Sequence, residues 1–280
     1  MNLVMCCTPL GREDRYLSEL RFAFFAALFF KKVYPYGRVF VATTLDANVP
    51  DMFSDHFETI RYNFSADSFA TERQLFYRDF CQSDKFTSDT VFTGCDVLVL
   101  NSFPKDTDGH HIHMTYRNHP SQPYCSDLVL VETGVRNQAI SFLEEVVNTM
   151  KWLPKENRPW TDQIALCLTI GKLSNQDYDG ESHHGTRFRD VALHPADRWL
   201  YTPNDYFSSQ LSHNPGSMVI ADEMKLDFDK LRRDKITIHF KGNRKSQFFN
   251  IARQAFESGY INLQVDSLPM PREHLFNEQQ

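Results

Sequence analysis

The chain has 280 residues, 41% hydrophobic and 24% charged, a composition that suits one large globular domain. Its net charge of −6 and isoelectric point near 6.0 argue against wholesale binding to nucleic acids or anionic membranes, so any anionic ligand must be held by a local group of cations. The six cysteines form no C-x-x-C pair, and we interpret them as reduced, mostly buried thiols.

The start of the chain already reads as a strand, so we expect no secretory leader. The one strongly apolar run, residues 22–30 (FAFFAALFF), is too short to span a bilayer and is flanked by basic residues. We interpret it as part of a core helix. The sequence therefore predicts a cytoplasmic protein with no transmembrane segment, and it leaves the oligomeric state open.

The amino-terminal part alternates between strand and helix patterns. The expected elements are a strand over 1–8, a helix over 12–32, a strand over 38–43, a strand within 57–64 and a helix over 71–80. Thr71 is a candidate cap of the last helix. A strand, a helix and a strand within the first 43 residues predict a parallel sheet with right-handed crossovers.

Periodicity disappears from residue 102 to 126, where we expect a long functional loop. The elements expected after it are a strand over 127–132, helices over 137–152 and from 161 to near Gly171, a loop over 174–190, strands over 198–201, 218–221 and 235–240, and a helix over 246–258 that Gly259 can end. No repeat, low-complexity tract or linker divides the chain.

The most informative stretch is Asp89–Leu100 (DTVFTGCDVLVL), a strand-like apolar run with Asp96 in its middle. An ionised carboxylate is costly to bury unless a cation or several donors meet it. Two interpretations are open. Either the strand ends near Gly94 and Asp96 begins a solvated turn, or Asp96 faces a metal ion and an anionic ligand at the carboxyl end of a central strand.

A candidate partner for Asp96 lies in residues 236–245 (ITIHFKGNRK). A strand with an alternating residue pattern ends near His239, and Gly242 after it lets a ligand approach the backbone closely. Over residues 225–245, eight Lys or Arg occur with three Asp. Lys241, Arg244 and Lys245 follow His239. A diphosphate would be held here.

These patches resemble the GT-A glycosyltransferases of family 8 and related families. The stretch from His239 to Lys245 is similar to their metal- and phosphate-binding signature, H-F-x-G-x-x-K, and Gly94–Leu100 is similar to their hydrophobic D-x-D-v-l-v-l segment. Residues 132–135 (ETGV) resemble their N-x-G-v segment near the sugar, and residues 160–166 (WTDQIAL) their W-x-D-Q-x-a-l segment near the reacting centre. Four patches in the same order are more specific than any one of them.

The resemblance implies an α/β fold of the GT-A (Rossmann-like nucleotide-diphospho-sugar transferase) type, with a mostly parallel central sheet flanked by helices. Residues 1–280 would form a single domain, with a nucleotide-sugar-binding half over about 1–101 and an acceptor-binding half over about 102–280 that carries the metal and diphosphate motif. The implied activity is transfer of a hexose or xylose from a UDP-sugar to a saccharide hydroxyl. Mn²⁺ or Mg²⁺ would assist departure of the diphosphate.

The resemblance also implies roles for single residues. Asp96 and His239 would bind the metal ion. The residues that would contact the nucleotide, the diphosphate or the donor sugar are Thr8, Pro9, Arg12, Tyr16, Arg73, Lys241, Gly242 and Lys245. One position departs from the pattern, because Gly94 stands where these enzymes have the first Asp of D-x-D. A hard dication prefers several oxygen ligands, so metal affinity without nucleotide should be weak, and metal-independent transfer stays open.

Asp162 and Gln163 are the candidate residues of the reacting centre. If the enzyme inverts the anomeric carbon, a carboxylate must take the proton of the acceptor hydroxyl, with Asp162 the first candidate and Glu132 the second. If it retains configuration, the leaving phosphate takes that proton while Gln163 or Asp162 supports the oxocarbenium ion. Alternatively, Asp162 is an early-helix acid that interacts with the helix dipole.

Two other functions stay open. Gly94 is also compatible with a catalytically inactive module of this fold that binds a sugar nucleotide or a glycan. A zinc-dependent hydrolase would draw on two histidine clusters, His110, His111, His113 and His119 and then His183 and His184. Neither cluster has the spacing of a tetrahedral zinc motif, so we expect acceptor contacts from these loops, with Tyr116 and Trp199 as aromatic partners.

Overall fold

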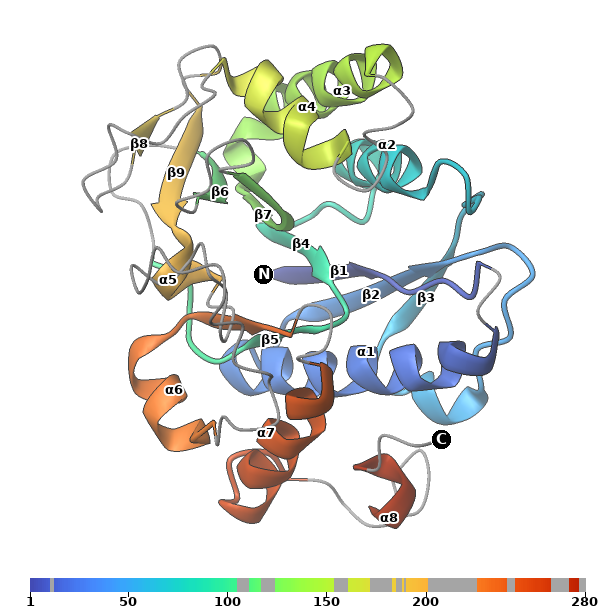
Figure 1. Cartoon of the computed structure of the whole chain (residues 1–280), viewed down its shortest axis with the longest axis vertical. Helices are drawn as coiled ribbons and strands as arrows, with labels where there is room; N and C mark the ends of the chain where they lie inside the picture. Colours follow the sequence, from blue (N-terminus) through green and yellow to red (C-terminus); the bar gives the residue numbers. More distant parts are fainter. Residues whose placement is uncertain are drawn as a thin grey trace, which may run out of the picture.

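The computed structural model describes residues 1–10, 13–104, 111–116, 124–153, 161–171, 183–184, 188, 190–200, 226–240, 245–262 and 272–276. Within them, the main sheet has eight strands in the order β3-β2-β1-β4-β7-β6-β9-β8 (Figure 1). The strands are β1 (Asn2–Cys6), β2 (Arg38–Thr43), β3 (Glu58–Arg61), β4 (Thr90–Gly94), β6 (Ile112–Tyr116), β7 (Tyr124–Val131), β8 (His183–His184) and β9 (Val191–Pro195). Only β7 and β8 run against the others, which confirms the predicted α/β fold with a mostly parallel sheet.

Helices cover both faces of this sheet (Figure 1). One face carries α1 (Glu13–Val33), α6 (Phe228–Asp234), α7 (Lys245–Glu257) and α8 (Arg272–Leu275), and the other carries α2 (Phe69–Gln82), α3 (Arg136–Trp152) and α4 (Thr161–Ile170). Side chains of β1 alternate between the two faces, so Leu3 and Met5 pack towards α1 while Val4 and Cys6 pack towards α2–α4. Across the described residues, no helix combines the length and the apolar character needed to cross a membrane.

A second, two-stranded sheet positions the site. Its strands are β5 (Val97–Val99) and β10 (Thr237–His239), which pair antiparallel so that His239 lies opposite Val97. The stretch read as one strand, 89–100, is therefore two strands in two sheets, with a turn at Cys95 and Asp96 between them. Asp96 sits where the chain passes from the large sheet to the small one.

Most predicted elements occur within a few residues of their expected bounds, and two glycines end helices as expected. Gly171 after α4 has φ +78° and Gly259 after α7 has φ +72°, a conformation that favours glycine. Thr71 is not a cap, because α2 begins two residues earlier.

Two predicted elements were wrong. The stretch 102–126 contains a buried strand, β6, and residues 198–199 belong to the short helix α5 (Ala196–Trp199) rather than to a strand, while residue 201 lies outside the described residues. The strand of that region, β9, ends at Pro195. Residues 218–221 lie outside the described residues.

Candidate active site

A cavity of about 470 Å³ opens at the carboxyl ends of β1 and β4. Ligand sites of open α/β sheets lie at such strand ends, and the volume is within the range of small-molecule sites. The cavity brings together predicted residues from four separate parts of the chain, namely Thr8, Pro9, Arg73, Asp96, His239 and Lys245. The structure thus gathers these predicted contacts around one space.

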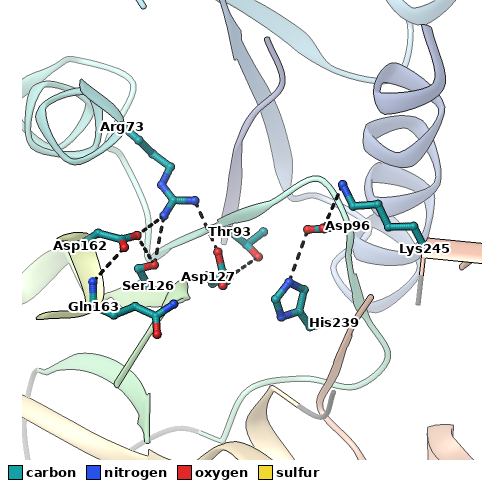
Figure 2. A network of polar contacts seen from close by, with 9 residues as sticks. All are labelled: Arg73, Thr93, Asp96, Ser126, Asp127, Asp162, Gln163, His239 and Lys245. Atoms are coloured by element: carbon teal, nitrogen blue, oxygen red, sulfur yellow. Dashed lines mark hydrogen bonds and ion pairs between the residues drawn. The ribbon is translucent and has the colours of Figure 1, made fainter. Parts of the chain in front are cut away.

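Asp96 faces an imidazole and an ammonium group in this cavity. One carboxylate oxygen lies 3.7 Å from His239 Nε2 and the other lies 3.5 Å from Lys245 Nζ (Figure 2). The Asp96 side chain is 16% exposed and that of His239 is 4% exposed. The backbone N–H of Phe240 donates to the Asp96 carbonyl at 3.0 Å and holds β10 against the turn. The strand does end near Gly94, but the carboxylate is mostly buried and points at the ligand space.

Lys245 keeps its charge in this setting. Burial is the largest single influence and lowers the pKa of Lys245, but Asp96, Cys95 and Glu19 together raise this pKa above its usual value. Lys245 is the first residue of α7 and follows the predicted glycine-containing turn. Lys241, Gly242 and Arg244 of that turn lie outside the described residues, as do Arg12 and Trp160.

Gly94 shapes the position of Asp96. A Cβ atom placed on Gly94 would lie 2.6 Å from Asp96 Oδ1, which is closer than side-chain contacts allow. The carboxylate therefore occupies space that any larger residue at position 94 would need. An Asp at position 94, the first acid of D-x-D, would therefore displace the carboxylate of Asp96, the second acid.

Asp96 and His239 offer a divalent ion one oxygen and one nitrogen. Their 3.7 Å separation is less than two metal–ligand bonds of about 2.1 Å laid end to end, so one ion can contact both atoms. Oxygen and imidazole ligands suit Mn²⁺ and Mg²⁺. Two protein ligands fit an ion that a diphosphate and water would complete.

Arg73 organises a second group of polar side chains on the other side of the cavity. Its Nη2 donates to Asp162 Oδ2 at 2.6 Å and to Ser126 Oγ at 3.1 Å, and its Nη1 lies 3.4 Å from Asp127 Oδ1. Burial alone would lower the pKa of Arg73, but Tyr77, Asp162 and Asp127 together raise it. Figure 2 shows this group and the Asp96 group facing each other across Thr93 and Asp127.

Asp162 is held by donors on both of its oxygens. Oδ2 accepts from Ser126 Oγ at 2.5 Å as well as from Arg73, and Oδ1 accepts from the backbone N–H of Gln163 at 2.9 Å. It lies in the first turn of α4, where an acid also favours the helix dipole. Asp162 and Gln163 are 6% and 4% exposed. Asp162 is not among the residues that line the cavity, but it contacts Arg73, which is.

Asp127 and Glu132, at the two ends of the predicted strand 127–132, lie at opposite ends of β4 because of the direction of β7. Because β7 runs antiparallel to β4, Leu128 pairs with Thr93 and brings the preceding Asp127 to the cavity. Glu132, the second candidate base, follows Val131, which pairs with Thr90 at the opposite end of β4. The structure therefore does not bring Glu132 to the cavity. Asp127 was missed, although a carboxylate next to an apolar strand was the available signal.

Glu132 belongs to a buried histidine cluster instead. Its Oε1 lies 3.0 Å from His113 Nε2, and His113 Nδ1 lies 2.9 Å from His194 Nε2. His194 stacks on Trp199 with ring centroids 3.6 Å apart. His113, His194 and Trp199 are almost fully buried, so the acceptor contacts expected from His113 and Trp199 are not available here. Within the described residues, this cluster does not form a three-ligand metal group.

The predicted nucleotide contacts are partly described. Thr8 and Pro9 line the cavity directly after β1. Tyr16 lies on α1, and its hydroxyl is 2.8 Å from Thr43 Oγ1 at the end of β2. Burial raises the pKa of Tyr16 to about 12, so it remains a neutral hydrogen-bonding group at neutral pH.

No protein-family model and no curated protein sequence matches the chain. Solved structures do match. An active-site mutant of LgtC shares 10% identity at a TM-score of 0.51, covering 98% of each chain. A glycosyltransferase involved in the glycosylation of the major capsid of PBCV-1 shares 10% identity at a TM-score of 0.50, covering 89% of this chain and 98% of that one. At these identities the likeness shows the fold, which is the predicted GT-A fold.

Proposed function

We propose that this protein is a glycosyltransferase that moves a hexose or xylose from a UDP-sugar to a saccharide hydroxyl. The proposal rests on one observation: a single cavity at the carboxyl ends of β1 and β4 is lined by Asp96, His239, Lys245 and Arg73. A nucleotide diphosphate needs cations at its phosphates and polar groups at its sugar, and the two sides of the cavity supply them.

The diphosphate side would stabilise the leaving group. Asp96 and His239 would hold Mn²⁺ or Mg²⁺, which supplies Lewis-acid stabilisation of the departing UDP. Lys245 enters the same space with its charge maintained, so it neutralises negative charge that develops on the diphosphate. On binding the donor, Lys245 would exchange the Asp96 carboxylate for a phosphate oxygen.

The opposite side would position the sugar. Arg73 and Asp127 line the cavity and can hydrogen-bond to sugar hydroxyls, while Ser126 and Asp162 hold the guanidinium in place. Asp162 already accepts three hydrogen bonds and is 6% exposed, which favours an electrostatic and positioning role over that of a general base. This supports the retaining route, in which a phosphate oxygen of the leaving group takes the acceptor's proton.

The test is release of UDP from a panel of UDP-sugars with Mn²⁺ and mixed glycan acceptors. Asp162→Asn keeps the shape of the side chain but removes the charge that pairs with Arg73, and should lower transfer about 10²- to 10³-fold, the loss typical of a preorganised electrostatic contact. Asp229→Asn, an exposed substitution on α6, is the matched control and should leave transfer unchanged. Absence of UDP release with every donor would refute the activity.

A catalytically inactive binding module of the same fold is the second candidate, favoured by Gly94 in place of an acid. It predicts the same Mn²⁺-dependent binding of UDP-sugars without turnover. Calorimetry beside the transfer assay separates the two functions, because binding without UDP release would select the module.

A further inference from the structure

Two thiols and a carboxylate meet in the wall of the cavity. Cys7 and Cys95 are the residues that directly follow β1 and β4, and the parallel register pairs the preceding Cys6 with Gly94. The two thiols are thus brought side by side by backbone pairing. Glu19 reaches them from α1, and the two sulfur atoms and a carboxylate oxygen all lie within 4.8 Å of one another.

This spacing approaches that of a zinc site. Zinc binds thiolates at about 2.3 Å and carboxylate oxygens at about 2.0–2.2 Å, so the ligand atoms of a tetrahedral site lie roughly 3.5–3.8 Å apart. The present group needs a contraction of at most about 1.3 Å to reach those distances. Thiolates also select zinc over magnesium and manganese, unlike the oxygen and nitrogen that Asp96 and His239 offer.

An ion can reach the group. Cys7 is fully buried and Cys95 is 7% exposed, whereas Glu19 is half-buried and lines the cavity together with Cys95. Three protein ligands would leave a fourth coordination position for water from the cavity. The other buried thiol considered below, Cys81, lies on α2 in the opposite core layer, away from this wall.

We propose that Cys7, Glu19 and Cys95 form a binding site for a thiophilic divalent cation, with Zn²⁺ as the natural probe. Both thiol protons pass to solvent when the ion binds. The ligand atoms of this site differ from those of Asp96 and His239, although Glu19, Cys95 and Asp96 line the same cavity, and the site does not depend on sugar transfer.

Cobalt titration of the full chain under reducing conditions tests the proposal, because Co²⁺ bound to thiolates gives a sulfur-to-metal charge-transfer absorption. We expect one equivalent of Co²⁺ to produce this absorption and Zn²⁺ to displace it. The absorption should disappear in Cys7→Ala and Cys95→Ala and persist in the matched control Cys81→Ala. No charge-transfer absorption, or an unchanged one in Cys7→Ala, would overturn the site.

Two further variants keep the test decisive even if an alanine variant does not fold. Glu19→Gln retains both thiols and the side-chain volume, and should weaken Co²⁺ binding by more than the roughly tenfold lost when a group that only orients a ligand is replaced. Asp96→Asn should leave the charge-transfer absorption in place. Loss of the absorption in Asp96→Asn together with unchanged affinity in Glu19→Gln would make Asp96, and not Glu19, the carboxylate ligand beside the thiols and refute the proposal.

Discussion

Replacing Arg73 by Met should strongly destabilise the protein, because it removes the cation from a buried ion pair while roughly keeping the side-chain length. The Arg73 side chain is 13% exposed and that of Asp162 is 8% exposed, and the two are joined at 2.6 Å. Breaking such a pair from one side leaves an uncompensated buried charge and costs about 3–5 kcal/mol. The free energy of unfolding in urea, at unchanged m value, measures this loss.

The surface pair of Arg38 and Glu58 is the matched control. Its atoms approach to 2.9 Å, but the side chains are 49% and 41% exposed, so Arg38→Met should cost about 1 kcal/mol or less. The double variant Arg73→Met, Asp162→Asn should be less destabilised than the sum of its single variants, because position 162 then carries no unpaired buried charge. A loss below about 1 kcal/mol for Arg73→Met would refute the description of a buried pair that organises the site.

Three further predictions concern the cavity and the buried thiols. Gly94→Ala should push the Asp96 carboxylate away from His239, because the new Cβ would lie 2.6 Å from Asp96 Oδ1. Calorimetry should show the Mn²⁺-dependent affinity for UDP falling about tenfold with little change in stability, and an unchanged affinity would contradict the close contact between position 94 and Asp96. Because the folded state raises the pKa of Lys245, the charged side chain stabilises the fold fully below about pH 10, and this stabilisation is lost as the pH rises through the folded-state pKa. The difference in urea stability between wild type and Lys245→Met should therefore stay constant from pH 6 to pH 9 and shrink only above about pH 10.5. Burial raises the pKa of Cys81 to about 12, so mass spectrometry should find this thiol unmodified by iodoacetamide at pH 8 until urea is added, and rapid labelling of the native protein would count against its burial.

Periodicity predicted the alternation of strands and helices but not where the chain changes sheets. Asp89–Leu100 reads as one strand because its residues are apolar on both sides, and only the pairing of β5 with β10 divides it at Asp96. The strand β6 was missed for the opposite reason. Its His113 and Thr115 read as loop residues, although tertiary contacts bury them completely.

The candidate site was predictable where a motif carried it. The resemblance brought together Asp96 and His239, which are 143 positions apart in the sequence and 3.7 Å apart in the structure. Strand direction was not predictable, so Glu132 was expected near the cavity and Asp127 was overlooked. The contact of Arg73 with Asp162 depends on where α2 and α4 lie relative to β7, which no local pattern encodes.

The most direct test of a divalent-metal donor site is calorimetry of UDP with and without Mn²⁺ on the wild type, Asp96→Asn and His239→Ala. Mn²⁺ should strengthen UDP binding in the wild type, and both substitutions should abolish this effect, since each removes one of the two protein ligands. Because a ligand stabilises the folded state that binds it, the wild-type melting temperature should rise in parallel. Full Mn²⁺-dependent affinity in both variants would contradict the placement of the donor site.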